Sequence, residues 1–146
     1  MNALFSLVEQ LVALGRPTIM GLESLLGVTL SPVSDANQHW SFYQAHQSSG
    51  LVASVEFREP VRGSSKNEPL LIVTLRDAPE RLQDLSQKYG TGRITDMSHH
   101  HLSFVGYTYV VGSRQVAFKI DSKSERVLGF SIDYSVAPGG SNKQGP

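Results

Sequence analysis

The segment from Ile94 to Tyr134 most strongly limits the folds that this chain can adopt. It contains three runs of β-branched and aromatic residues, and short polar stretches that suit chain reversal separate them. Apolar and polar side chains alternate along residues 116–121 and 128–133, which is the period of a strand with one buried face. The segment therefore predicts an antiparallel meander.

Further strands are predicted upstream of this meander. Residues 39–47 and 51–59 alternate in the same way on either side of a Ser-Ser-Gly turn, so they predict a hairpin. The run LLIVTL, residues 70–75, is a continuous apolar stretch. Such a run predicts a strand near the middle of the sheet that is buried on both faces.

Two helices are predicted before the first strand. Apolar residues recur at helical spacing over residues 4–14, and Gly15 provides a C-terminal stop. A shorter helix is predicted up to residue 26, with Thr18 as its N-cap and Gly27 as its terminator.

A third helix is predicted in the middle of the chain, where Asp77 provides an acidic N-cap, Glu80 follows three residues later and Gly90 ends the helix. The order of elements predicts a single α+β domain over residues 1–135, with a mostly antiparallel sheet of about six to seven strands and all three helices packed on one face. Residues 136–146 are rich in Gly, Pro and polar residues, which predicts a flexible C-terminal tail.

The composition limits the possible partners and compartment. Thirteen basic and thirteen acidic residues cancel, so the chain has no long-range field that would attract nucleic acid. The absence of cysteine excludes disulfides, thiolate zinc sites and a cysteine nucleophile, and it favours the cytoplasm. The N-terminal apolar run lacks a basic start, is interrupted by Glu9 and is too short for a membrane span, so neither a signal peptide nor a span is predicted.

Residues 97–101, Met-Ser-His-His-His, form a cluster of metal-capable side chains. On a strand, His99 and His101 would project from one face, with Asp96 or His39 as a possible third ligand. Spacing alone supplies no third ligand, so the favoured interpretation is a solvated cluster with no bound metal or cofactor. The alternative is a small metal-dependent or hydrolytic enzyme that uses Asp96, His99 and His101.

Motifs that would require catalysis are absent from the sequence. The chain has no Gly-x-Ser-x-Gly elbow, no phosphate-binding loop, no His-Glu-x-x-His helix and no EF-hand. We therefore assign no catalytic residue.

The first 55 residues carry only four of the 26 charged residues, namely Glu9, Arg16, Glu23 and Asp35. In addition, the apolar arc of the first helix is wider than one contact with a sheet requires, so part of it should meet another protein or a second copy in a two-fold dimer. Strand aromatics with a polar tip and an outward orientation would also suit an interface. The predicted interface residues are Phe5, Val12, Tyr43, Tyr107 and Tyr109.

Together these features favour a non-catalytic cytoplasmic module that binds another protein. Small bacterial proteins of similar size and layout include immunity proteins or inhibitors that neutralise a toxin, and chaperones for secreted effectors. The predicted partner is therefore another protein, a toxin or an effector, with a homodimer as an alternative.

Overall fold

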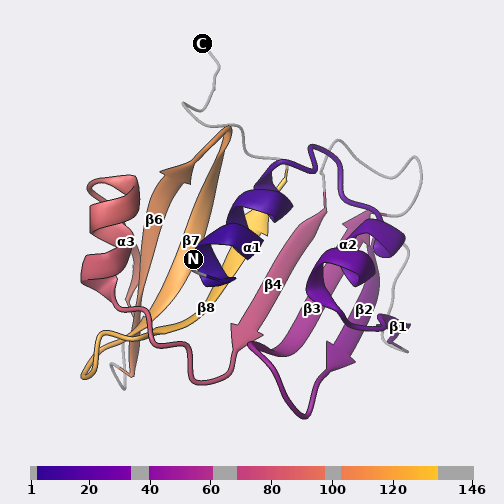
Figure 1. Ribbon diagram of the computed structural model, residues 1–146. Helices are drawn as coiled ribbons and strands as arrows, with labels where there is room; N and C mark the ends of the chain where they lie inside the picture. Colours follow the sequence, from indigo (N-terminus) through magenta and orange to yellow (C-terminus); the bar gives the residue numbers. More distant parts are fainter. Residues whose placement is uncertain (1–2, 34–39, 61–68, 98–102, 135–146) are drawn as a thin grey trace.

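The computed structural model describes residues 3–33, 40–60, 69–97 and 103–134. Three helices lie on one face of an eight-stranded antiparallel sheet, which confirms the predicted α+β class with slightly more strands than expected (Figure 1). The helices are α1 (Ala3–Val12), α2 (Ile19–Leu26) and α3 (Leu82–Tyr89). The strands are β1 (Ser31–Pro32), β2 (Trp40–His46), β3 (Val52–Pro60), β4 (Leu70–Leu75), β5 (Arg93–Met97), β6 (Phe104–Val111), β7 (Arg114–Asp121) and β8 (Val127–Asp133). The predicted tail, 136–146, lies outside the described residues.

The sheet consists of two antiparallel meanders joined side by side. Its strand order is β1-β2-β3-β4-β8-β7-β6-β5, so the pairing of β4 with β8 joins the two halves. The predicted C-terminal meander is confirmed as β5 to β8. The additional strand is β1, which has only two residues and lies at one edge of the sheet.

Local signals set both ends of α2. The Thr18 hydroxyl oxygen accepts a hydrogen bond from the Gly21 backbone amide at 3.0 Å, as expected of an N-cap. Gly27 adopts a left-handed conformation with φ 68°, which glycine reaches without a steric penalty. Both caps were predicted from the sequence.

The start of α3 differs from the prediction. The N-cap residue is Arg81, whose backbone amide donates to the Asp84 carboxylate at 2.9 Å, and not Asp77. The reason is tertiary, because Arg81 forms a β-bridge with Arg126, and the Glu80 carbonyl accepts a hydrogen bond from the Val127 amide. This pairing holds the chain extended up to residue 81, so the helix starts after it.

The core lies between the helices and the sheet. Leu4, Val8 and Leu11 of α1 are fully buried against the sheet. The Tyr134 hydroxyl donates to the Leu11 carbonyl oxygen at 2.8 Å, and Arg114 donates to the Gly15 carbonyl oxygen at 2.7 Å, so the end of α1 is fastened to the sheet. A series of rings in contact extends from α1 across α3 into the sheet, formed by Phe5, Tyr89, Tyr109, Phe118 and Phe130.

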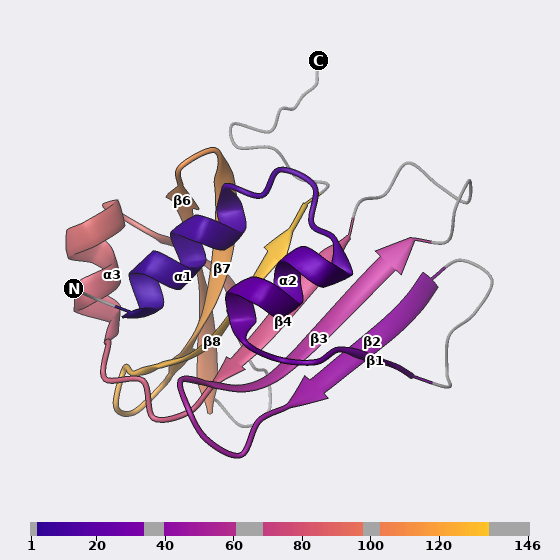
Figure 2. The same ribbon diagram turned by 45° about the vertical axis from the view of Figure 1, so that its right-hand side comes forward.

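Strand β4 lies in the middle of the sheet, as predicted, but only one of its faces is covered. Leu71, Val73 and Leu75 are buried beneath the helices. Leu70 and Ile72, which point the other way, remain half-buried. Figures 1 and 2 show all three helices on the same side of the sheet, and no described helix or strand covers the opposite side. The prediction of burial on both faces was therefore wrong.

Candidate functional site

The side of the sheet that faces away from the helices is called the open face here. Alternation along the strands, with buried residues on the helix side, places a group of half-buried apolar side chains on this face. These residues are Trp40, Phe42, Leu70, Ile72, Phe104, Ala117 and Leu128. An uncovered apolar surface of this kind commonly marks a binding site.

A hollow of about 510 Å³ lies on the open face, over β4, β8, β7 and β6. Its floor consists of small residues on adjacent strands: Ser131 pairs with Ala117, and Gly129 and Gly106 both pair with Lys119. The larger apolar side chains that line it are Leu70, Ile72, Phe104 and Leu128. The hollow is therefore deepest where the small residues lie, and larger apolar side chains form its wall.

Gly129 keeps the centre of the floor free of side chains. A Cβ atom at this position would collide with the carbonyl oxygen of Val73 on the neighbouring strand. The register between β7 and β8 also shifts next to this position, between Lys119 and Ile120. The close approach of the β8 backbone to the β4 backbone thus requires glycine at position 129.

Charged groups also lie on the open face, and one of them, Lys119, lines the hollow. The Lys119 ammonium group is 4.4 Å from the centre of the Phe104 ring. The Arg58 guanidinium group lies 5.8 Å from the centre of the Phe42 ring and forms a 2.9 Å ion pair with Glu56. The open face therefore combines apolar and aromatic side chains with a few charged groups, and protein interfaces contain the same combination.

The three predicted interface tyrosines lie on the other side of the sheet. Tyr43 packs on Phe57 with ring centres 6.3 Å apart, and Tyr107 is half-buried against the core. Tyr109 is only 1% exposed, and its hydroxyl is 2.9 Å from the Ser86 hydroxyl. They therefore face the helices and not outward as predicted, because the observed register places them beside core residues.

The other two predicted interface residues are partly or wholly enclosed by the fold. Val12 is 4% exposed and belongs to the core, which corrects its predicted place at an outer rim. Phe5 packs edge-on against Tyr89 of α3 with ring centres 5.5 Å apart. The apolar arc of α1 is wide because the helix contacts the sheet on one side and has α2 and α3 as its flanking neighbours.

Glu9 of α1, one of the four charged residues in the first 55, contacts α3. The Glu9 carboxylate accepts a hydrogen bond from the Tyr89 hydroxyl at 2.8 Å and lies 3.7 Å from the Lys88 ammonium group. Burial, together with this hydrogen bond and the Glu9 charge, raises the pKa of Tyr89 above its usual range. The charge of Glu9 is thus directed at α3.

The predicted metal-binding set is placed only in part. His99 and His101 lie outside the described residues, and the backbone of Asp96 belongs to β5, opposite Gly106. Within the four described ranges, no three His, Cys, Asp or Glu side chains are grouped closely enough to hold a metal ion. The metal site therefore stays an untested alternative to the predicted solvated cluster.

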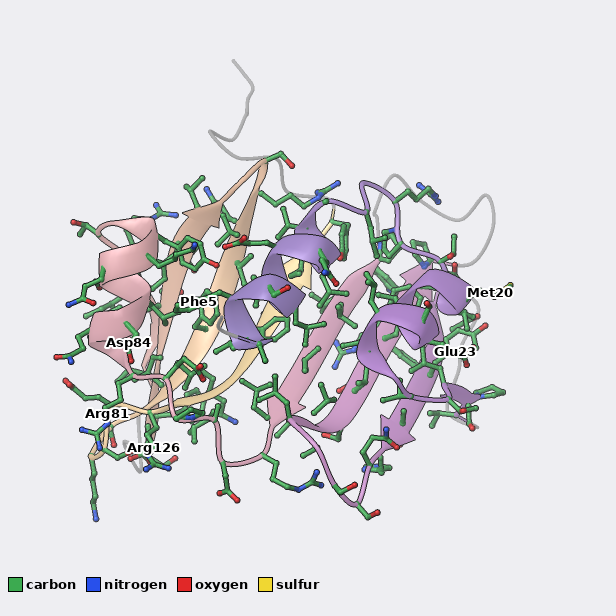
Figure 3. All side chains as sticks on the ribbon, in the orientation of Figure 1. Phe5, Met20, Glu23, Arg81, Asp84 and Arg126 are labelled. Atoms are coloured by element: carbon green, nitrogen blue, oxygen red, sulfur yellow. The ribbon has the colours of Figure 1, made fainter. Side chains whose placement is uncertain are left out.

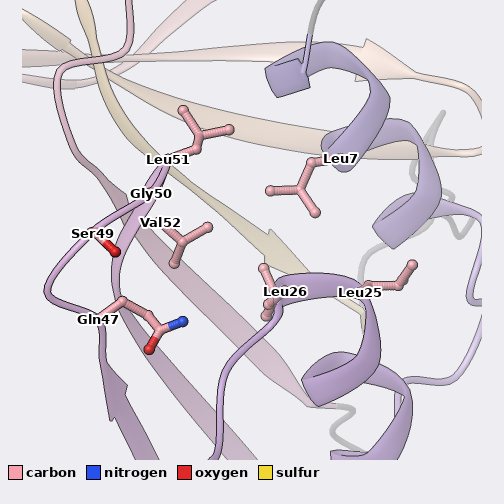
Figure 4. A pocket seen from close by; sticks show the side chains of 8 residues that line it. All are labelled: Leu7, Leu25, Leu26, Gln47, Ser49, Gly50, Leu51 and Val52. Carbon is pink, nitrogen blue, oxygen red and sulfur yellow. The ribbon is translucent and has the colours of Figure 1, made fainter.

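A second, smaller hollow of about 260 Å³ lies on the helical side, between α1, α2 and the β2–β3 turn (Figure 4). Its lining is uncharged and consists of Leu7, Leu25, Leu26, Gln47, Ser49, Gly50, Leu51 and Val52. Arg76 donates hydrogen bonds to the carbonyl oxygens of Gln47 and Gly50, and the Gln47 side chain donates to the Gly27 carbonyl oxygen at 2.6 Å. These bonds fix the turn against α2, so the hollow is preformed.

Sequence reasoning missed Leu70 and Ile72 as site residues because it assigned their strand to a position that is buried on both faces. The usable signal was the run LLIVTL, in which Leu70 and Ile72 are as apolar as the residues that alternate with them. A strand covered on one face only would ordinarily carry polar residues at those positions.

Comparison of the chain with protein-family models, with curated protein sequences and with solved structures gives no significant match. Among the helices in the described ranges, none has the length and apolar character needed to span a membrane.

Proposed function

We propose that this protein is a non-catalytic module that binds a partner protein through the open face of its sheet. The observation that carries the proposal is the apolar hollow over β4, β8, β7 and β6, on the side of the sheet opposite the helices. Leu70 and Ile72 in its wall would remain in contact with water unless a partner covered them, and burial of apolar surface favours association.

The shape of the open face supports a protein partner over a small ligand. Small-molecule sites usually enclose most of the ligand surface, whereas this hollow lies on one face of a sheet. A helix or a loop that projects from a partner could enter the hollow and also cover the surrounding apolar residues. Two copies placed open face to open face would leave an unfilled space between their hollows, and such voids lose packing energy.

The proposal includes two classes of partner, a toxin that the protein neutralises and a secreted effector that it holds before export. In both cases the protein would act in the cytoplasm, and its lack of cysteine suits a reducing compartment. The identity of the bound protein distinguishes the two classes.

Affinity purification from the cells that make the protein tests this function. The test variant is Ile72→Lys, which places a charge in the wall of the hollow. The matched control is Ile94→Lys, the same substitution at a residue of the edge strand β5 that is 56% exposed. We expect wild type and Ile94→Lys to retain the same partner, and Ile72→Lys to lose most of it, because a buried unpaired charge opposes association.

Thermal melts of the three proteins establish that each is folded. A partner that is retained equally by folded Ile72→Lys would contradict the proposal. If no protein is retained by wild type at near-stoichiometric amounts, the proposed function is wrong as well.

A further inference from the structure

Of the described residues that line the hollow on the open face, Lys119 alone is charged. The other polar side chains of the lining, those of Thr74, Thr95 and Ser131, are neutral hydroxyls. Lys119 is exposed, and its ammonium group lies 4.4 Å from the centre of the Phe104 ring. The hollow is therefore an apolar surface that carries a single positive charge.

The neighbouring strands leave space around the Lys119 side chain. The residues directly opposite Lys119 are glycines on both sides, Gly106 of β6 and Gly129 of β8. Residues that are directly opposite on adjacent strands normally place their side chains next to each other. Because both neighbours are glycines, a group that enters the hollow can reach the ammonium group directly.

Within the described ranges, no carboxylate lies at ion-pair distance from Lys119. On the open face, Glu56 is already paired with Arg58 at 2.9 Å. Asp121, two residues along β7, accepts hydrogen bonds from the Ser124 amide at 2.7 Å and from the Ser124 hydroxyl at 2.8 Å. These bonds hold the Asp121 carboxylate in the turn after β7, so the charge of Lys119 is left for a partner to neutralise.

We propose that the partner segment that enters the hollow carries a carboxylate next to its apolar residues, and that this carboxylate binds Lys119. The inference rests on the proposed function. A partner that fills the hollow removes water from the ammonium group, and burial of an unpaired charge opposes association. A carboxylate that accepts a charge-assisted hydrogen bond from Lys119 replaces the lost water. Lys119 thus selects a segment that is both acidic and apolar over one that is only apolar.

Binding constants for the partner retained in the affinity purification test this inference. The test variant is Lys119→Met, which keeps an apolar stem and removes the charge. We expect it to weaken binding by about 30-fold or more, because the partner's carboxylate would be buried without its donor. Lys119→Arg keeps a positive charge and should recover most of the affinity. Isothermal titration calorimetry measures both variants.

The matched control is Lys88→Met, on the helical side of the sheet. The Lys88 ammonium group also lies over a phenylalanine ring, 6.0 Å from the centre of Phe5, which Figure 3 shows between α1 and α3. The control removes the same charge from the side opposite the hollow, so it should bind the partner with wild-type affinity. Thermal melts establish that each variant is folded.

A carbodiimide cross-link identifies the acid on the partner. The reagent joins a lysine amine to a carboxylate as an amide without adding a spacer, so it links only groups that are in contact. We expect an amide between Lys119 and an Asp or Glu of the partner, located by mass spectrometry of the peptides. Lys119→Arg should bind the partner and lose this link, because the reagent does not couple a guanidinium group.

The combined results separate this inference from the proposed function. If Lys119→Met binds with wild-type affinity while Ile72→Lys loses the partner, the open face is the binding site and the carboxylate contact is wrong. The absence of an amide at Lys119 in the bound complex would also overturn the contact. If both variants bind like wild type, or if wild type retains no partner, the proposed function is wrong and this inference fails with it.

Discussion

Tyr134 directs its hydroxyl into the core, where it donates to the Leu11 carbonyl oxygen. Burial raises its pKa from 10.0 to about 12, although the nearby Arg114 charge acts in the opposite direction. The folded protein therefore holds this proton to a higher pH than the unfolded chain does. The associated stability is fully present below about pH 10 and is lost as the pH rises toward about 12.

Tyr134→Phe should therefore make stability less sensitive to alkaline pH. At pH 8 we expect the variant to be less stable by about 1 kcal/mol, because it lacks one buried hydrogen bond. Between pH 10 and pH 12 the free energy of unfolding should fall less steeply than in wild type. Urea denaturation at several pH values measures both slopes, and equal slopes would show that Tyr134 does not contribute.

Single residues also distinguish the two faces of the sheet. Leu11→Ala and Phe118→Ala each remove a buried side chain from the helical side and should cost about 2–5 kcal/mol. Lys119→Ala alters an exposed residue of the open face and should cost about 0.5 kcal/mol or less. Chemical denaturation measures these values, and a large loss for Lys119→Ala would mean that the face assignment is wrong.

At the scale of elements, α3 provides a test of the corrected helix start. The Asp84 carboxylate satisfies the Arg81 amide at the first turn, so Asp84→Ala should destabilise the protein by about 0.5–2 kcal/mol. Asp84→Asn keeps an oxygen acceptor and should retain part of this stability. Thermal denaturation of both variants measures the difference. If Asp84→Ala has no effect, the hydrogen bond to Arg81 is not stabilising.

The elements that the sequence predicts correctly are those with local signals. Thr18 and Gly27 determine the ends of α2 through contacts within the helix itself, and alternation identifies the strands. The start of α3 was missed because the bridge between Arg81 and Arg126 joins segments that are distant in the sequence. The faces of Tyr107 and Tyr109 likewise depend on strand register, which a periodic pattern alone does not determine.

At the scale of the whole molecule, the fold is asymmetric, since all three helices lie on one side of the sheet. The order of the elements predicted this one-sided packing, whereas the run LLIVTL wrongly predicted that β4 is buried on both faces, because a run of apolar residues does not identify what covers each face. The interpretation of β4 as a central strand was correct, and the apolar residues on its uncovered side became the candidate site.

Site-specific photo-cross-linking in the cells that make the protein tests the role of the open face most directly. A photoreactive p-benzoylphenylalanine replaces Phe104 on the open face in one protein and Ile94 at the sheet edge in another. We predict an adduct with a partner protein from position 104 that is lost when Ile72→Lys is added, and none from position 94. No adduct from position 104, or an equal adduct from both positions, would contradict the claim that the open face binds a partner.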